Sequence, residues 1–202
     1  MNSVQQKEAL DRRLTDREKN MFKKAIIAIA TIAALGASSM SSANAFMGQS
    51  RNVKIGRQAT VPIAFSLYCL KHLEECRPSS QSQVAYTAKV RNLLASVNRS
   101  VNRSIRPVRE SRDVWSLNPT SGDCDDYAVS KRSRLIRAGI PSGALRIAVV
   151  RTPAGEGHAV LLVKTNAGEF ALDNLRQTIV KRNQTGYRYI SVASANPMRW
   201  TR

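Results

Sequence analysis

The chain has 202 residues, of which 43% are hydrophobic and 23% are charged. These fractions are ordinary for a globular domain, and they exclude a wholly disordered chain, a collagen and a multi-pass membrane protein. The formal net charge of +18 is unusual, because 32 lysines and arginines face only 14 aspartates and glutamates. The three cysteines are too few for a disulfide-dense scaffold, and an odd number leaves at least one thiol unpaired.

The N-terminal segment predicts export. Two lysines precede the thirteen-residue apolar core 25–37, and residues 43–45 (Ala-Asn-Ala) have the small-x-small pattern that signal peptidase recognises. The core is shorter than the roughly 20 residues of a membrane-spanning helix. We therefore expect residues 1–45 to be a signal peptide with a long charged lead-in, cleaved after Ala45. The lead-in is either an extended n-region, or Met21 is the true initiator.

The positive charge remains after this predicted cleavage. Residues 46–202 keep 25 basic and 10 acidic residues, a net charge of +15. A nucleic-acid-binding surface would combine clustered charge with stacking aromatics, but here the basic residues are spread out and aromatics make up only 5%. We therefore expect a monomer without a nucleic-acid partner, whose charge gives solubility or attraction to an anionic envelope surface.

Apolar residues follow helical spacing in the first half of this segment and form short strand-like runs in the second half. Helices are expected over residues 61–76, 83–105 and 122–138. Strands are expected over residues 144–150, 157–164, 169–172 and 187–192. The long middle helix is expected to be capped by Ser80 or Ser82 and to turn its Asn-Arg pairs towards solvent. Residues 46–202 are thus predicted to form one α+β domain with N-terminal helices packed on an antiparallel sheet.

Three residues could form a nucleophilic site. Cys124 begins a predicted helix, where the helix dipole favours the thiolate, although a lone cysteine is more often a small buried hydrophobe. His158 lies in an otherwise apolar strand, and Asp173 ends the next one. If these strands pair through an even-numbered loop such as 165–168, Asp173 lies opposite Val160 and shares a face with His158. An odd-numbered loop would turn Asp173 to the wrong face.

A Cys-His-Asp set supplies a nucleophile, a base and a carboxylate that orients the base. The surrounding motifs resemble those of the bacterial transglutaminase-like cysteine proteases, whose best-understood branch is the LapG-like, periplasmic, adhesin-releasing type. The matching blocks are residues 122–128 (Gly-Asp-Cys-Asp-Asp-Tyr-Ala), 157–161 (Gly-His-Ala-Val-Leu) and 172–174 (Leu-Asp-Asn). The likeness extends from about residue 61 to residue 190.

This resemblance implies a papain/transglutaminase-like fold and a catalytic triad of Cys124, His158 and Asp173. It implies a periplasmic or secreted thiol protease that cleaves a protein substrate, such as a cell-surface adhesin, through a thioester and without a cofactor in the chemical step. Acyl transfer of the transglutaminase or deamidase type would use the same triad, because only the group that resolves the thioester differs. A non-enzymatic, basic envelope-binding module with a relic triad is the alternative outside enzymes.

The resemblance also implies a calcium site at Asp123 and Asp125, although relatives usually carry Glu at the second position. Carboxylates beside Cys124 should raise its pKa, and a hard cation would cancel their charge. The alternative is that Asp123 caps the helix and its acidic neighbours favour the helix start. In this fold an upstream Trp can stabilise the oxyanion, which makes Trp115 a candidate beside backbone N–H groups near Cys124. Cleft lining or core filling is the alternative for Trp115.

Cys69 and Cys76 are candidates for a disulfide in an oxidising compartment. In a continuous helix their Cα atoms would be about 10.5 Å apart, and a disulfide tolerates less than about 7 Å. Pairing therefore requires the first predicted helix to break near His72, which we expect to be a surface residue and not a metal ligand.

Overall fold

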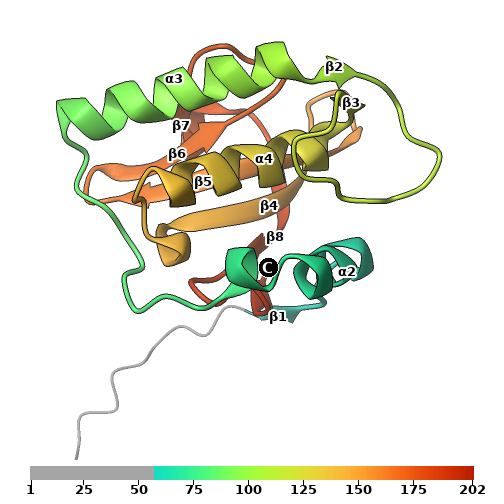
Figure 1. Ribbon diagram of the computed structural model, residues 1–202, viewed down its shortest axis with the longest axis horizontal. Helices are drawn as coiled ribbons and strands as arrows, with labels where there is room; N and C mark the ends of the chain where they lie inside the picture. The colour runs from blue at the N-terminus through green and yellow to red at the C-terminus, as the bar shows by residue number, and fades with distance from the viewer. Residues whose placement is uncertain (1–56) are drawn as a thin grey trace, which may run out of the picture. The chain divides into compact units, whose positions relative to one another are not determined.

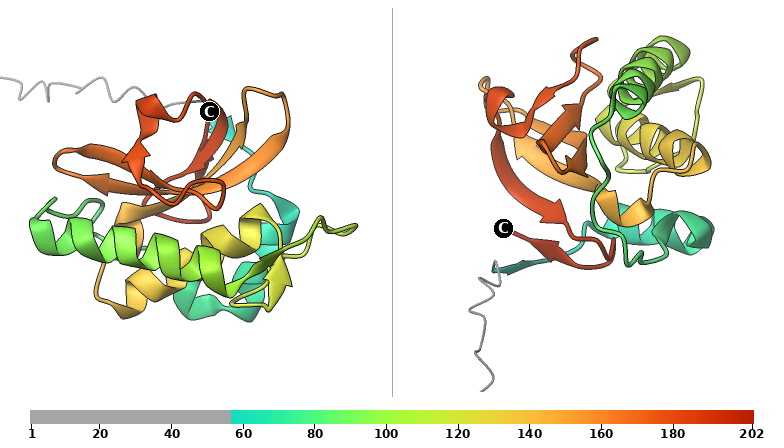
Figure 2. Two further views of the ribbon diagram at one scale, coloured as in Figure 1. Left: turned by 90° about the horizontal axis from the view of Figure 1, so that it is seen from above. Right: turned by 90° about the vertical axis from the view of Figure 1, so that its left-hand side faces the viewer.

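The computed structural model describes residues 57–202. An antiparallel sheet is the centre of this part of the chain, and the main helices cover one of its faces (Figures 1 and 2). The predicted signal peptide, residues 1–45, lies outside the described residues. The sheet has seven strands in the order β1-β9-β8-β4-β5-β6-β7, and all its pairs are antiparallel. Among the described residues, no helix is both long enough and apolar enough to cross a membrane. The predicted α+β class is confirmed.

The main helices are α2 (Ile63–Lys71), α3 (Ala88–Ser104) and α4 (Cys124–Arg137). Short 3-10 helices are η1 (Leu73–Cys76), η2 (Ser142–Ala144) and η3 (Arg182–Gln184). The four longer strands are β4 (Leu145–Arg151), β5 (Gly157–Thr165), β6 (Gly168–Leu172) and β8 (Arg188–Ala193). Two-residue strands are β1 (Gln58–Ala59), β7 (Val180–Lys181), β9 (Trp200–Thr201) and the parallel pair β2 (Arg106–Pro107) and β3 (Ser121–Gly122).

The α3 helix begins five residues later than the sequence pattern predicts. Residues 83–87 run alongside β5, because the backbone N–H of Val84 donates to Lys164 and its carbonyl accepts from Asn166. The cap is Thr87, whose hydroxyl accepts a hydrogen bond from the Val90 N–H at 3.2 Å. The predicted caps Ser80 and Ser82 are therefore wrong, because Val84 forms a bridge with the end of β5 and the helix begins only after it.

The solvent-facing position predicted for the asparagines of α3 is also wrong. Asn98 is fully buried and Asn102 is half-buried, whereas Arg99 and Arg103 are exposed. Both asparagine side chains donate hydrogen bonds to backbone carbonyls in the turn 173–177, at 2.8–3.1 Å. The helix therefore holds the turn that follows β6.

The β5–β6 hairpin has the register that an even-numbered loop requires. Thr165 pairs with Gly168 and Leu161 with Leu172, which leaves a two-residue turn between the strands. Gly168 has a φ of +111°, a backbone conformation that favours glycine. Continuing this register by one residue brings Asp173 opposite Val160.

A disulfide joins Cys69 and Cys76, whose Cα atoms are 5.5 Å apart. The first predicted helix is not continuous: α2 ends at Lys71, and η1 begins after His72. This break brings the two cysteines within bonding distance. The bridge also closes the segment that contains Glu75, whose carboxylate accepts a hydrogen bond from Ser133 of α4 at 2.6 Å.

Replacing both bridge cysteines with serine is expected to lower the free energy of unfolding by roughly 2–3 kcal/mol, because the closed loop is short. Urea unfolding measures this change, and wild-type protein treated with a reductant should show the same loss. An unchanged urea midpoint would contradict a stabilising role for the bridge.

Candidate active site

The turn that presents Cys124 is fixed by the buried carboxylate of Asp126. Its two oxygens accept hydrogen bonds from the backbone N–H of Ser116 at 2.6 Å and of Asp123 at 3.2 Å. A Cβ atom on Gly122 would lie 2.0 Å from one of these oxygens, so glycine is required there. The sequence indicated Asp126 only as an acidic residue that favours a helix start, and its burial was not foreseen.

Cys124 is the first residue of α4, and among the described residues it is the free cysteine. Its sulfur is half-buried and lies 4.0 Å from Asp125 Oδ1. Burial, followed by the charges of Asp125 and Asp123, raises the pKa of the thiol to about 12, although the Ala159 N–H opposes this rise. The thiol therefore needs a base or a cation before it can act as a nucleophile.

His158 and Asp173 form a buried hydrogen-bonded pair. His158 Nε2 lies 2.9 Å from Asp173 Oδ1, and the two side chains are 6% and 1% exposed. Burial raises the pKa of Asp173, but hydrogen bonds from His158, Tyr187 and the Leu175 N–H outweigh this effect and hold the pKa below its usual value. The carboxylate is therefore ionised and accepts the proton that His158 carries on Nε2.

This pairing leaves His158 Nδ1 as the nitrogen that can accept a proton. The backbone of Ala159, the residue directly after His158, lowers the pKa of the Cys124 thiol and so opposes the effect of burial. Cys124 therefore lies near the beginning of β5, which carries His158, and Asp173 directly follows β6. The structure contains the His158–Asp173 pair, and the triad that adds Cys124 to this pair stays a prediction.

Lys131 adds a buried cation next to this site. It lies seven residues beyond Cys124 on α4, about two helical turns, and is 1% exposed. Burial lowers the pKa of its ammonium group to about 7, and the charge of Asp173 opposes that decrease. The seven-residue spacing places Lys131 on the same side of α4 as Cys124, and this spacing is the sequence signal for its position near the site.

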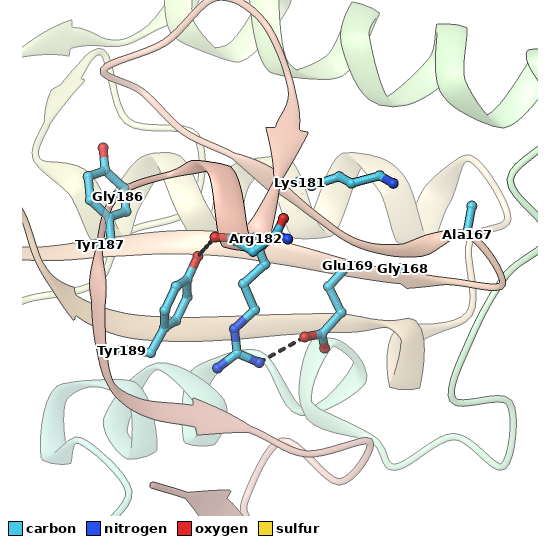
Figure 3. Close-up of a pocket in the computed structure, with 9 residues that line it drawn as sticks. Ala167, Gly168, Glu169, Lys181, Arg182, Gly186, Tyr187 and Tyr189 are labelled. Atoms are coloured by element: carbon cyan, nitrogen blue, oxygen red, sulfur yellow. Dashed lines mark hydrogen bonds and ion pairs between the residues drawn. The ribbon is translucent and has the colours of Figure 1, made fainter.

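Cys124 borders a cleft of about 600 Å³. Its other lining residues include Glu110, Asp123, Glu156 and Asn174. A separate pocket of about 480 Å³, lined by residues of β6, β7, η3 and β8, contains none of the three triad residues (Figure 3). The cleft is therefore the place where a substrate can reach the sulfur.

The oxygens beside Cys124 fit a hard cation. The candidate ligand atoms of Asp123, Cys124 and Asp125 lie within 4.8 Å of one another. Asp123 Oδ1 and Asn174 Oδ1 are buried and have no hydrogen-bond partner among the described residues, and both side chains border the cleft. Burial and the neighbouring Asp123 raise the pKa of Asp125 well above its usual value. Asp123 and Asp125 could hold a calcium ion, which prefers oxygen ligands.

Trp115 is a core residue and is not among the described residues that line the cleft beside Cys124. It is 7% exposed and packs on Phe65 with ring centroids 5.1 Å apart. Its indole N–H donates to Asp113 at 2.9 Å, and it borders a separate hollow of about 110 Å³. This geometry fits the core-filling alternative for Trp115, because its indole N–H already donates to Asp113.

A thiol at the start of a helix, near a sheet that carries a His-Asp pair, is typical of cysteine enzymes of the papain and transglutaminase type. The family model described as "Bacterial transglutaminase-like cysteine proteinase BTLCP" matches residues 55–202. The chain belongs to this family. Comparison with curated proteins gave no match.

Solved structures of LapG from Legionella pneumophila are similar to this chain. One LapG structure shares 24% identity over 55% of this chain and 68% of its own, with a TM-score of 0.50. The calcium-bound structure shares 26% identity over 52% of this chain and 66% of its own, with a TM-score of 0.48. The EGTA-treated structure shares 26% identity over 51% and 62%, with a TM-score of 0.46. This chain thus spans about two thirds of the length of these proteins, or slightly less.

Proposed function

We propose that the protein is an exported thiol endopeptidase whose nucleophile is Cys124. The observation that supports this most is the 2.9 Å hydrogen bond between His158 and Asp173 next to a thiol at a helix start. Asp173 holds the proton on Nε2, so that Nδ1 of His158 takes the proton from the cysteine sulfur.

In the first half of the reaction the sulfur attacks the carbonyl carbon of the scissile peptide bond. Backbone N–H groups at the start of α4 stabilise the oxyanion that forms. The carbon–nitrogen bond then breaks, and the proton on His158 passes to the departing amine. Water attacks the resulting thioester, His158 takes a proton from that water, and the thiol and a new carboxyl group are released.

Profiling of cell-envelope proteins for new peptide ends, with wild-type protein and a Cys124→Ala variant, tests this function. New N-termini that appear only with the wild type support the protease. Covalent incorporation of an added amine, or conversion of glutamine to glutamate, without new termini would indicate acyl transfer of the transglutaminase or deamidase type, and none of these products would indicate a binding module. Each result distinguishes one of the three functions.

Calcium is the proposed regulator of the thiol. Asp123 and Asp125 are its proposed ligands, and Asn174, which also borders the cleft, has a carbonyl oxygen without a partner among the described residues. A bound calcium ion would cancel the two carboxylate charges that raise the pKa of Cys124. Without the ion, the residues next to the nucleophile oppose its ionisation.

Calcium is expected to raise the midpoint of thermal unfolding and to increase cleavage, and a chelator is expected to reverse both effects. The rise in the midpoint follows from preferential binding to the folded state. In an Asp125→Asn variant both responses should disappear, whereas Glu156→Gln, a change at another acidic residue of the cleft, should keep them. Equal midpoints for the wild type with calcium and with chelator would refute the proposed site.

The proposed location is the periplasm or the cell exterior, and the proposed substrate is a cell-surface or periplasmic protein such as an adhesin. The Cys69–Cys76 disulfide supports an oxidising compartment. The net positive charge would favour proteins that lie near an anionic envelope surface.

A further inference from the structure

A tyrosine outside the predicted triad contacts the catalytic pair. Tyr187, which directly precedes β8, donates its hydroxyl to Asp173 Oδ2 at 2.6 Å. The edge of its ring meets His158, with centroids 5.7 Å apart and planes at 78°. One oxygen of the carboxylate therefore binds the histidine while the other binds the tyrosine.

The backbone around Tyr187 is held in place by neighbouring groups. Its N–H donates to the hydroxyl of Thr185 at 3.2 Å, and that hydroxyl donates to the Arg182 carbonyl at 2.9 Å. The guanidinium group of Arg176 lies 5.6 Å from the centre of the Tyr187 ring and donates to the Thr185 carbonyl at 2.9 Å. Because Arg176 belongs to the turn after Asp173, the tyrosine and the carboxylate are fixed to the same local structure.

We propose that Tyr187 is a positioning residue of the active site, whose hydroxyl fixes the rotation of the Asp173 carboxylate against His158 Nε2. This inference rests on the proposed thiol protease function. The terminal torsion of an aspartate is soft, so a single hydrogen bond to His158 leaves the carboxylate free to turn. A second short hydrogen bond to the other oxygen removes that freedom. Residues that hydrogen-bond a metal ligand fix the orientation of that ligand in the same way.

The other groups around Asp173 cannot replace this hydroxyl. Lys131 of α4 interacts with the carboxylate through its charge and donates no hydrogen bond to it among the described residues, and the Leu175 N–H binds Oδ1, the same oxygen that binds His158. Tyr187 is the side chain that holds Oδ2. Burial, followed by its contact with Asp173, raises the pKa of Tyr187 to about 12, so the phenol remains a neutral donor at lower pH.

Tyr189 provides a matched control, because it lies two residues further along the same segment (Figure 3). Its hydroxyl contacts the Thr185 hydroxyl at 3.3 Å and the Arg182 carbonyl at 3.5 Å, and its ring lies 4.2 Å from the guanidinium carbon of Arg182. Replacing either tyrosine with phenylalanine removes one hydroxyl and keeps the ring. The two variants differ in whether the lost hydroxyl binds Asp173.

The test compares Tyr187→Phe and Tyr189→Phe in cleavage kinetics, thermal unfolding and proton NMR of the histidine ring N–H. Tyr187→Phe is expected to lower kcat about tenfold, which corresponds to the loss of one hydrogen bond to a charged group. KM should stay unchanged, because Tyr187 is not among the described residues that line the cleft. Tyr189→Phe should leave both constants at their wild-type values.

The NMR measurement is specific because the chain has only two histidines, His72 and His158. The ring N–H resonance that disappears in a His158→Gln variant belongs to Nε2 of the catalytic pair. This resonance should shift and exchange faster with water in Tyr187→Phe, and should not change in Tyr189→Phe. Such a shift reports a change in the geometry of the His158–Asp173 hydrogen bond. A general loss of stability would not change this one resonance selectively.

Equal kcat values and an unchanged resonance in the two variants would overturn the positioning role. Equal losses of kcat and of thermal stability in both variants would also overturn it, because they would indicate a merely structural effect. If the wild type cleaves no protein, the thiol protease function fails. The NMR comparison then still decides whether Tyr187 orients the carboxylate.

Discussion

Replacing His158 with glutamine is expected to reduce peptide cleavage by about 10⁵-fold, while the protein remains folded. Glutamine can still hydrogen-bond Asp173, but it cannot take the proton from Cys124. The buried thiol, whose pKa is raised to about 12, would then remain protonated at neutral pH. The loss should appear in kcat, because His158 is proposed to act on the reacting atoms and not to hold the substrate.

His72 gives the matched control for this variant, since it is the other histidine of the chain. It forms the C-terminal cap of α2, and its ring lies 4.6 Å from that of Tyr68. His72→Gln should keep the wild-type rate. A His158→Gln variant with more than a tenth of the wild-type kcat would exclude His158 as the base.

Replacing Asp173 with asparagine is expected to reduce kcat by about 10³- to 10⁴-fold. The neutral amide no longer fixes the proton on His158 Nε2, so the ring can place its proton on Nδ1, the nitrogen proposed to take the proton of the thiol. The change also leaves the buried ammonium group of Lys131 without the negative charge that it faces. Stability should therefore fall as well, and kcat must be measured on protein shown to be folded at the assay temperature.

Asp113→Asn is the control for this change. Asp113 also accepts a side-chain N–H, from Trp115 at 2.9 Å, but it does not border the cleft that contains Cys124. The control should keep the wild-type kcat. If the two asparagine variants lose the same amount of activity, Asp173 has no special role in orienting the histidine.

The sequence predicts the His158–Asp173 pairing because it depends on local rules. The loop between β5 and β6 has an even number of residues, and the alternation of side chains along paired strands then decides which residues meet. The start of α4 could be predicted for a similar reason, since Asp123 precedes the helix and acidic residues fill its first turn. Both predictions need only a few neighbouring residues.

The missed features depend on contacts between distant segments. Periodicity places Asn98 on a polar position of α3, but only the folded chain shows that the turn after β6 covers this position and needs donors for its carbonyls. Tyr187 lies fourteen residues beyond its carboxylate partner, on a separate segment. Trp115 packs on Phe65, fifty residues earlier in the chain, so its place in the core also depends on a distant contact.

The rate at which iodoacetamide labels Cys124 at neutral pH, with calcium present, tests the central claim most directly. Cys124 is the free cysteine among the described residues, so each molecule should take up one label, located by peptide mass spectrometry. If His158, oriented by Asp173, ionises the sulfur, iodoacetamide should label Cys124 much faster than it labels free cysteine. The same ionisation predicts a slow rate in His158→Gln and the wild-type rate in His72→Gln. Labelling as slow as that of free cysteine, and equal in the wild type and both histidine variants, would contradict the account.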